Sequence, residues 1–286
     1  MEKLCDLHVH STFSDGTCTP EELIDIAQSF GMGAVALCDH NTVAGLPSFL
    51  MAAQGREVEA VPGVEFTTEF EGTELHILGL FIQPEHYDLI TEVFNDFRIR
   101  KEQSNIALVA ALKRAGILLD YDAMKNKTPD GYINRAVIGA EMVRLGYCES
   151  VKAAFSGWLS PKHGYYIPPK RLDAFDAIRF IKSIGAVAVF AHPFLNLDEE
   201  GVRRFLNTAK QAGLDGMEVY YPLFDEDQTR LACRIAEEYG LCFSGGSDFH
   251  GANKPHIQMG TGMDNLAVPM SVLNTLKQQS VFLKNN

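Results

Sequence analysis

The sequence predicts an α/β fold built around a mainly parallel sheet. Short apolar runs alternate with helical patterns, which is typical of strand-helix units. The chain has 286 residues, of which 46% are hydrophobic and 22% charged, so it belongs to the globular class and can bury a large core. This length fits two domains or one α/β barrel with a small insertion.

The apolar runs define seven strands, expected over Leu4–His10, Ala34–Cys38, Glu59–Glu65, Glu74–Phe81, Ala186–Ala191, Gly216–Tyr220 and Leu241–Ser244. The first helix is signalled by Thr19 as N-cap, Pro20 in the first turn and two acids, with an apolar face formed by Leu23, Ile26, Ala27 and Phe30. Further helices are expected over Leu46–Gln54, Tyr87–Ala115, Ala174–Ile184, Glu199–Ala212, Asp225–Tyr239 and Val268–Gln279.

The alternation of strand and helix patterns stops after Phe81 and resumes at Ala186. This gap is too long for a structureless loop. Helical patterns inside the gap, joined by polar turns such as Lys127–Gly131, cover Ile106–Arg114, Ile133–Leu145 and Val151–Trp158. We therefore expect residues 102–166 to form a small helical insertion in a unit made of residues 1–101 and 167–286.

A possible dinucleotide motif, Gly31-Met32-Gly33-Ala34-Val35-Ala36, is rejected by its context. The motif lies after a helix and before a strand, whereas dinucleotide binding requires the opposite order. A helix-ending glycine followed by a tight turn explains the pattern.

The formal net charge of −12 opposes binding that depends on a broad basic surface, such as tracking along nucleic acid or attachment to anionic lipid. If the protein handles phosphate, the positive charge must be local, and metal ions could supply it. The six cysteines form no C-x-x-C pair and are expected to be reduced thiols. With no leader segment and no apolar stretch of about 18 residues, a cytoplasmic location without membrane contact is the default expectation.

Histidines and acids gather at the expected strand ends. His8 and His10 flank Val9, so a strand would aim both rings to one side. Because carboxyl ends of parallel strands converge on one face, the later groups should join them there. These groups are Asp15, Asp39, His40, Glu65, His76, His192, Asp248 and His250.

So many ligands exceed the three or four of a single zinc site and indicate two or three divalent ions that share carboxylates. Taken alone, His76 is more simply an ordinary strand histidine and Asp39 a helix N-cap. Chance does not explain ionisable groups at five or more strand exits, where burial without a partner is costly.

The motifs His8-Val9-His10-Ser11, Ser14-Asp15-Gly16, Asp39-His40, Gly63-Val64-Glu65, Ala191-His192-Pro193 and Ser247-Asp248-Phe249-His250 resemble those of the PHP (polymerase and histidinol phosphatase) family, over nearly the whole chain. The branch with a helical insertion, which includes 3′,5′-nucleotide bisphosphate phosphatases, is most similar. The resemblance implies a distorted (β/α)7 barrel with three divalent ions, usually Mn, Zn or Fe. It implies that His8, His10, Glu65 and Asp248 hold one ion, that Glu65 bridges to a second held by His76 and His192, and that Asp15, His40 and His250 hold the third.

Adjacent divalent ions can polarise phosphoryl oxygens and lower the pKa of a shared water, so hydrolysis of a phosphate ester is the expected reaction. Three residues are expected to take part in catalysis, namely Asp39, His250 and Arg135. Asp39 would orient a ligand histidine or the attacking water.

Substrate selectivity is expected from the insertion and the strand-end loops. The resemblance implies that Arg135 contacts a substrate phosphate within an Arg-x-His element, but here Val137 stands in place of that histidine. A second phosphate contact is then expected from Lys162, His163 or Lys254, and His256 could approach the site. A solvated arginine at a helix start remains the alternative for Arg135. The expected substrates are AMP, a 3′,5′-bisphosphonucleotide or the 5′ end of a short oligonucleotide.

Three alternatives stay open. A phosphatase of a small metabolite such as histidinol phosphate would use the same metals. An amidohydrolase also begins with H-x-H, although Asp15, the Asp39-His40 pair and Glu65 fit a third ion better. A non-catalytic metal-binding module is disfavoured by the complete set of ligands.

Overall fold

A computed structural model describes residues 3–127, 133 and 135–281 of the chain. The chain divides into two compact units, the first formed by Met1–Thr91 and Leu172–Asn286 and the second by Glu92–Arg171. Helix α3 (Tyr87–Arg114) begins in the first unit and continues in the second.

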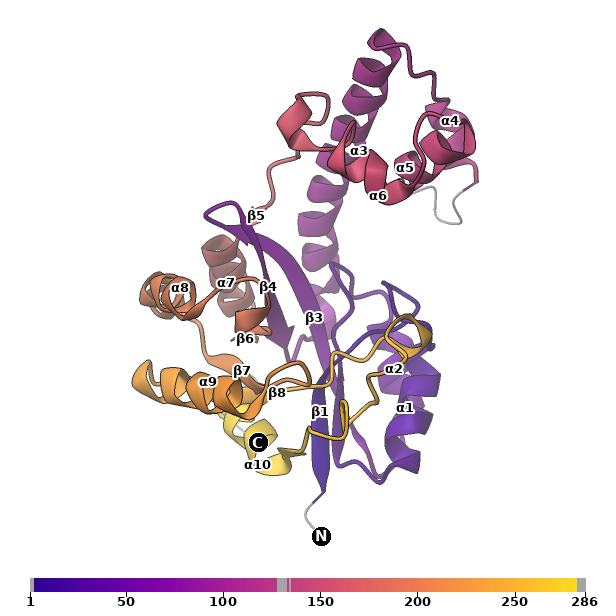
Figure 1. The fold of residues 1–286 in the computed structure, drawn as a ribbon. Coiled ribbons are helices and arrows are strands. Elements are labelled where there is room, and N and C mark those ends of the chain that lie inside the picture. The colour runs from indigo at the N-terminus through magenta and orange to yellow at the C-terminus, as the bar shows by residue number, and fades with distance from the viewer. Residues whose placement is uncertain (1–2, 128–132, 134, 282–286) are drawn as a thin grey trace. The chain divides into compact units, whose positions relative to one another are not determined.

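The first unit is built on one curved sheet (Figure 1), which confirms the predicted α/β class. Its strands lie in the order β8-β7-β6-β4-β3-β2-β1-β9. Beyond β8, the backbone of Asp248 donates to the His8 carbonyl at 2.8 Å and that of His10 donates to the Phe249 carbonyl at 2.9 Å, so the sheet curls into a nearly closed barrel. The strands are β1 (Leu4–Val9), β2 (Ala34–Leu37), β3 (Glu59–Phe70), β4 (Thr73–Leu80), β6 (Val187–Phe190), β7 (Gly216–Tyr220), β8 (Cys242–Gly245), and the two-residue β5 (Leu172–Asp173) and β9 (Val268–Pro269).

The expectation of a parallel sheet is wrong for β4, which runs antiparallel to both β3 and β6. The reason is a two-residue turn at Glu71 and Gly72, whose φ angles of 50° and 78° are those of a tight hairpin. A second correction follows, because β3 continues to Phe70 and Glu65 lies inside the strand instead of ending it. The reversal of β4 also carries His76, near its start, to the edge where the parallel strands end.

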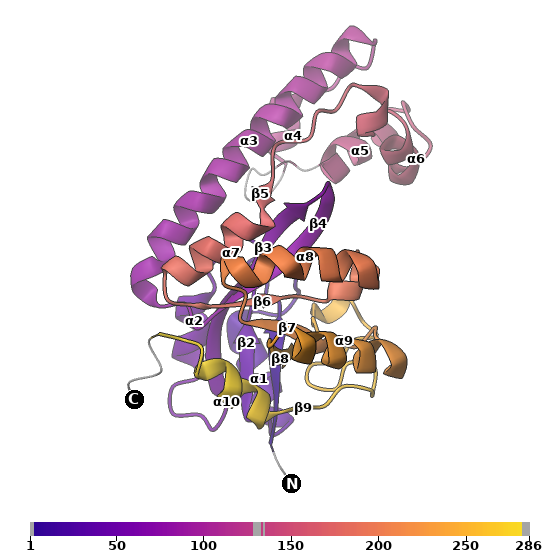
Figure 2. The same ribbon diagram turned by 90° about the vertical axis from the view of Figure 1, so that its left-hand side faces the viewer.

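Helices cover the outside of this sheet. In Figure 1, α1 (Pro20–Ser29) and α2 (Leu46–Ala52) lie on one flank, and α7 (Ala174–Ser183), α8 (Glu199–Ala212) and α9 (Glu226–Glu238) lie on the other. Figure 2 shows α8 and α9 one below the other on that second flank, with α10 (Met270–Lys277) beneath them. Thr19 and Glu22 form the capping box of α1. The predicted apolar face of α1 is wrong at Phe30, which is 59% exposed, because Ile24 is buried beside Leu23 and Ala27 instead.

Alternate side chains of β1 face opposite sides of the strand, one side toward the hydrophobic core and the other toward the candidate site. Cys5 and Leu7 point into a buried apolar cluster that includes Ala36, Val189 and Leu273. Asp6 and His8, one residue out of phase, are equally buried but face the other side of the strand. The glycine motif after α1 is a helix end followed by a turn, as expected, since Gly31 has φ +64° and β2 follows it.

The second unit is helical. It contains most of α3, then α4 (Tyr121–Lys125), α5 (Arg135–Arg144), α6 (Val151–Ser156) and the 3₁₀ turn η2 (Pro161–His163). Leu112, Ile138, Met142 and Leu159 belong to its own buried core. The sequence did not reveal α4, which Asp120 caps. Asn134 and most of the predicted turn at Lys127–Gly131 lie outside the described residues. Within the described ranges, no helix is both long and apolar enough to cross a membrane.

Candidate metal centre

Glu65 lies at the centre of a ring of imidazoles and is itself fully buried. Five histidine nitrogens approach its two carboxylate oxygens within 3.3 Å. On Oε2 these are His8 Nε2 at 3.3 Å, His10 Nε2 at 3.3 Å and His40 Nδ1 at 3.1 Å, and on Oε1 they are His76 Nδ1 at 2.8 Å and His192 Nε2 at 3.2 Å.

The barrel topology brings these groups together from distant parts of the sequence. His40 lies in the segment after β2 and pairs with Glu65 as an isolated bridge, in which the Asn41 N–H donates to the Glu65 carbonyl at 2.9 Å. His192 follows β6, and the backbone N–H of Ala191 before it donates to the carbonyl of His76 at 3.1 Å. The pairing of β4 with β6 therefore places His76 and His192 side by side.

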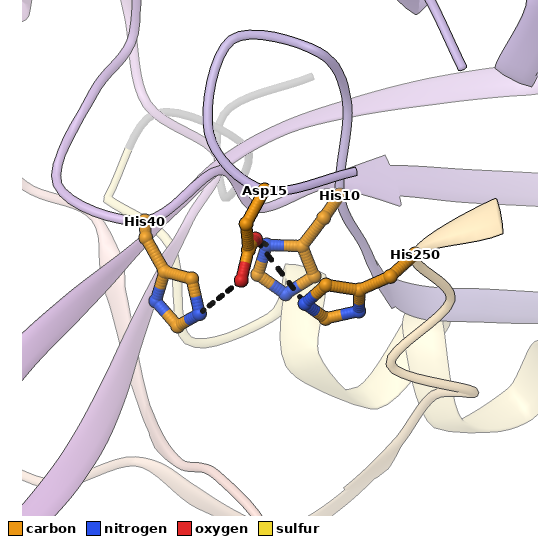
Figure 3. A group of neighbouring side chains, drawn as sticks. All are labelled: His10, Asp15, His40 and His250. Carbon is orange, nitrogen blue, oxygen red and sulfur yellow. Dashed lines mark ion pairs between the residues drawn. The ribbon is translucent and has the colours of Figure 1, made fainter. Parts of the chain in front are cut away.

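A second group gathers around Asp15 in the loop after β1 (Figure 3). Figure 3 shows the Asp15 carboxylate between the rings of His40 and His250. Asp15 Oδ1 lies 3.2 Å from His250 Nε2 and 3.7 Å from His10 Nδ1, and Oδ2 lies 3.8 Å from His40 Nε2. These four residues could hold one metal ion. His10 and His40 thus belong to this group and to the ring around Glu65.

Asp248 completes the centre from the loop after β8. Its Oδ1 lies 3.3 Å from His10 Nε2 and 3.8 Å from His8 Nε2. Its Oδ2 accepts hydrogen bonds from the Tyr221 hydroxyl at 2.8 Å and from the Lys254 ammonium at 2.6 Å. One oxygen of Asp248 is therefore occupied by the protein, and the other is directed at the histidines.

The donor set fits divalent cations. Six buried atoms of this cluster have no hydrogen-bond partner within the described part of the chain, and they are His8 Nε2, both ring nitrogens of His10, His40 Nδ1, Glu65 Oε2 and His76 Nδ1. Unsatisfied buried polar atoms are costly, so their convergence requires a partner. Tetrahedral ligands at about 2.1 Å from an ion are about 3.4 Å apart, close to the spacing seen here. Imidazole and carboxylate donors suit zinc, manganese and iron.

The charges of these side chains reflect their burial and their ion pairs. Burial disfavours charge on His10, but Asp248 and Glu65 outweigh it and raise its pKa to about 9. For His76, Glu65 and Glu74 likewise outweigh burial and raise the pKa to about 10. His40 differs, because burial and the neighbouring histidines lower its pKa to about 4 despite Glu65.

The pKa values of the two buried carboxylates, Glu65 and Asp248, are lowered. Burial raises the pKa of Glu65, yet His40, His76 and His8 outweigh burial and hold it well below its usual range. The pKa of Asp248 is also well below its usual range, because His10 and His8 outweigh burial. The centre therefore presents ionised carboxylates to His10 and His76, which carry protons until a metal replaces them.

The expected role of Asp39 in orienting a ligand histidine or the attacking water stays a prediction, and the structure shows what its carboxylate binds. Its Oδ1 accepts from the Ser11 backbone N–H at 2.8 Å and from the Ser14 hydroxyl at 2.6 Å, and its Oδ2 accepts from the Ser11 hydroxyl at 2.6 Å. The N-cap of α2 is Gly45, so Asp39 caps no helix. Asp39 anchors the loop that carries Asp15.

Three buried polar residues around the centre were not identified from the sequence. Glu218, in β7, accepts from His8 Nδ1 at 3.0 Å and from the His192 backbone at 2.7 Å. Asp6 accepts the backbone N–H groups of Ser247 and Gly260, each at 2.8 Å, and Tyr221 donates to Asp248. A lone carboxylate inside the otherwise apolar β7 is the signal that could have revealed Glu218.

The predicted substrate-binding residues fall into both units. Lys254 contacts Asp248, as described, and His256 is exposed in the same loop. In the second unit, the Arg135 guanidinium lies 4.3 Å from the ring centre of Tyr166 and 5.1 Å from that of Phe155. It donates to the Leu159 carbonyl at 3.2 Å, so it is packed and not simply solvated. Lys162 and His163 are exposed on η2, and Val137 packs against the helical core.

Comparisons with known proteins agree with this architecture. A family model for the PHP domain matches residues 6–133. A 5′-3′ exoribonuclease from Haemophilus influenzae is 34% identical over 251 residues, which cover 87% of this chain and 91% of that protein. A 3′,5′-nucleoside bisphosphate phosphatase from Chromobacterium violaceum is 31% identical over 247 residues, which cover 86% of each chain.

Two solved structures share the fold over nearly the full length. A protein of Bifidobacterium adolescentis, described as a metal-dependent phosphoesterase, superposes with a TM-score of 0.74 at 28% identity and covers 99% of both chains. A protein of Chromobacterium violaceum, described as an amidohydrolase with bound sulfate and no metal, gives a TM-score of 0.71 at 26% identity, with 95% of this chain and 96% of that chain covered.

Proposed function

The chain belongs to the PHP family and is a metal-dependent phosphoesterase, and on that premise we propose that it hydrolyses a phosphate ester of a nucleotide at a centre of three divalent ions. The observation that carries the proposal is the buried Glu65 carboxylate, which five imidazole nitrogens approach within 3.3 Å. Such a carboxylate is suited to bridge two ions.

We propose the following distribution of ligands. His8, His10, Glu65 and Asp248 hold one ion, Glu65 with His76 and His192 a second, and Asp15, His40 and His250 a third. Divalent ions bound there would polarise the phosphoryl oxygens and lower the pKa of a water molecule. The ions would be Mn, Zn or Fe, in line with the imidazole and carboxylate donors.

The protein's own residues would then position the phosphate. Lys254 places its ammonium beside Asp248 and supplies local positive charge in a chain whose net charge is −12. His250 lies 3.2 Å from the half-exposed Asp15, where it can meet a substrate that enters from solvent. Arg135 presents a guanidinium held on two aromatic rings, a form suited to a second phosphate. Lys162 and His163, exposed in the same unit as Arg135, and the exposed His256 would add to phosphate binding.

The proposed substrates are AMP, a 3′,5′-bisphosphonucleotide and the 5′ end of a short oligonucleotide. The two curated relatives act on ribonucleic acid and on nucleoside bisphosphates according to their names. A panel of AMP, 3′,5′-bisphosphorylated adenosine, a 5′-phosphorylated oligonucleotide, histidinol phosphate and a dihydropyrimidine amide tests the proposal on metal-loaded protein. Release of phosphate or nucleotide from the first three compounds is expected. Amide cleavage without release of phosphate or nucleotide from any ester would overturn the proposal.

Matched variants separate the chemistry from folding. Glu65→Gln should abolish most activity and reduce bound metal, whereas Glu69→Gln, in the same strand but outside the ring of histidines, should retain both.

Arg135→Ala should raise the KM for the bisphosphorylated substrate more than for AMP. Arg144→Ala, at the other end of α5 and paired with Glu141 at 2.7 Å, is its control. Equal KM values for Arg135→Ala and wild type would refute the role of Arg135.

We also propose a cytoplasmic location. All six cysteines are free thiols, as is usual for proteins of reducing compartments. Cell fractionation with detection of the native protein tests this, and recovery from an oxidising compartment would contradict it.

A further inference from the structure

Glu218 is the buried carboxylate next to the metal centre that the proposed chemistry leaves without a role. It lies in the middle of β7, between the buried Met217 and Val219, and is fully enclosed. A carboxylate in such surroundings is costly unless both oxygens are satisfied. Both are satisfied, because Oε1 lies 3.0 Å from His8 Nδ1 and Oε2 accepts the His192 backbone N–H at 2.7 Å.

The first of these bonds sets the orientation of the His8 ring. With Nδ1 held by Glu218, the opposite nitrogen, Nε2, faces Glu65 Oε2 at 3.3 Å and Asp248 Oδ1 at 3.8 Å. Nε2 has no hydrogen-bond partner among the described residues. A carboxylate that accepts the proton of one ring nitrogen leaves the other nitrogen with its lone pair toward a metal.

The second bond holds an unfavourable backbone conformation. His192 has φ 30° and ψ 59°, in the left-handed region that residues with a Cβ rarely adopt. In this conformation its ring reaches Glu65 Oε1 at 3.2 Å, on the opposite oxygen from His8. The rings of His8 and His192 lie nearly parallel, with centroids 5.8 Å apart.

We infer that Glu218 is a positioning residue that aligns His8 and His192 at once and thereby couples two of the metal positions. The two histidines contact different oxygens of Glu65, so they serve different ions in the proposed centre. One carboxylate behind them fixes the ring of one ligand and the backbone of the other. This inference rests on the proposed metal centre and not on the identity of the substrate.

Glu218→Gln is the decisive variant. A glutamine keeps the size of the side chain but has a single acceptor oxygen, so its NH₂ group must face one of the two N–H donors. Asp215→Asn is the matched control, because Asp215 immediately precedes β7 and also accepts a backbone N–H, from Ala188 at 2.9 Å, but contacts Lys182 instead of a metal ligand.

The measurement is zinc affinity, obtained by competition with a chelator on metal-depleted full-length protein, with bound zinc counted by elemental analysis. We expect Glu218→Gln to weaken two binding steps by roughly 10-fold to 100-fold each and Asp215→Asn to match wild type. Wild-type affinity in Glu218→Gln, or equal weakening in Asp215→Asn, would overturn the inference. Phosphate release is not the readout, so a wrong substrate proposal leaves this test intact.

A second measurement needs no variant. In zinc-loaded wild-type protein labelled with ¹⁵N-histidine, long-range proton-nitrogen spectra should show His8 protonated at Nδ1 and coordinated through Nε2. A His8 ring protonated at Nε2 or coordinated through Nδ1 would overturn the inference, even if Glu218→Gln does not fold.

Discussion

Two of the histidines beside Glu65, His10 and His76, hold protons that a metal must displace. His10 and His76, with pKa values of about 9 and about 10, carry protons at pH 7 in the metal-free protein, whereas His40, with a pKa of about 4, does not. Metal binding requires neutral imidazoles, so metal and proton compete at these sites. Without metal, the ion pairs of protonated His10 and His76 stabilise the folded protein most below pH 6.5. This contribution to the free energy of unfolding is lost as the pH rises through about 9 to 10.

We therefore predict that metal uptake at pH 7 releases more than one proton per chain and that the apparent affinity rises with pH until about pH 10. Calorimetric titration of metal-depleted protein in two buffers with different ionisation enthalpies measures the number of protons. A binding heat that is the same in both buffers would show that the histidines are already neutral, which contradicts the prediction.

The sequence and the structure reveal different residues of the candidate site. The motifs name the groups that converge, because several histidines and acids at strand exits would be costly to bury together without a metal. The pattern does not reveal what the carboxylates behind them contact, because Glu218 and Asp6 lie inside strands and their partners come from other parts of the chain. A single acid in a buried strand is a local anomaly, and only the three-dimensional neighbours account for it.

The loop between β1 and α1 is anchored by Asp39, which lies just after the neighbouring strand β2. Asp39 accepts three hydrogen bonds from Ser11 and Ser14, and the same loop carries Asp15. Asp15 itself is half exposed, and its backbone carbonyl accepts a second anchoring hydrogen bond from Asn253 Nδ2 at 2.8 Å.

Asp39→Ala should free the loop, lower stability by about 1–3 kcal/mol, weaken the metal position that contains Asp15 and reduce turnover. Asp39→Asn keeps one acceptor oxygen and should fall between alanine and wild type. Thermal unfolding, metal content and kcat measure these effects, with Asp25→Asn as control, since Asp25 forms only an exposed ion pair with Arg56. Unchanged metal content and turnover in both Asp39 variants would assign Asp39 no part in the centre.

The elements that the sequence placed best are long or strongly capped, such as α8, which spans the predicted residues. The direction of β4 was not predicted, because Glu71 and Gly72 resemble an ordinary polar turn until both adopt positive φ. The strands β5 and β9, of two residues each, are too short to produce a periodic pattern. Pairing with β3 and β1 creates them, so they depend on tertiary structure.

For the whole molecule, a net charge of −12 predicts that only a short stretch of any nucleic acid is bound. Each phosphate of a single strand neutralised by the protein contributes about 0.7 to the slope of log affinity against log salt. We expect a slope below about 2 in magnitude for kcat/KM, and similar kcat/KM values for 5′-phosphorylated oligonucleotides of about 5 and about 50 nucleotides. Steady-state kinetics at several salt concentrations test both statements. A steep slope together with a preference for long substrates would mean that an extended binding track exists.

The pairing of the first strand with the last one has a consequence for biosynthesis. Leu4 and Cys5 in β1 pair with Pro269 and Val268 in β9, so β1 leaves the ribosome long before its partner strand. The second unit is made in between and has its own core, so it can fold first. His8, His10, His40, Glu65 and His76 are synthesised before it, and His192, Asp248 and His250 after it. A nascent chain therefore holds an incomplete set of the proposed ligands, and we expect loading of the full proposed centre to be a late event that follows synthesis of β8 and the loop after it.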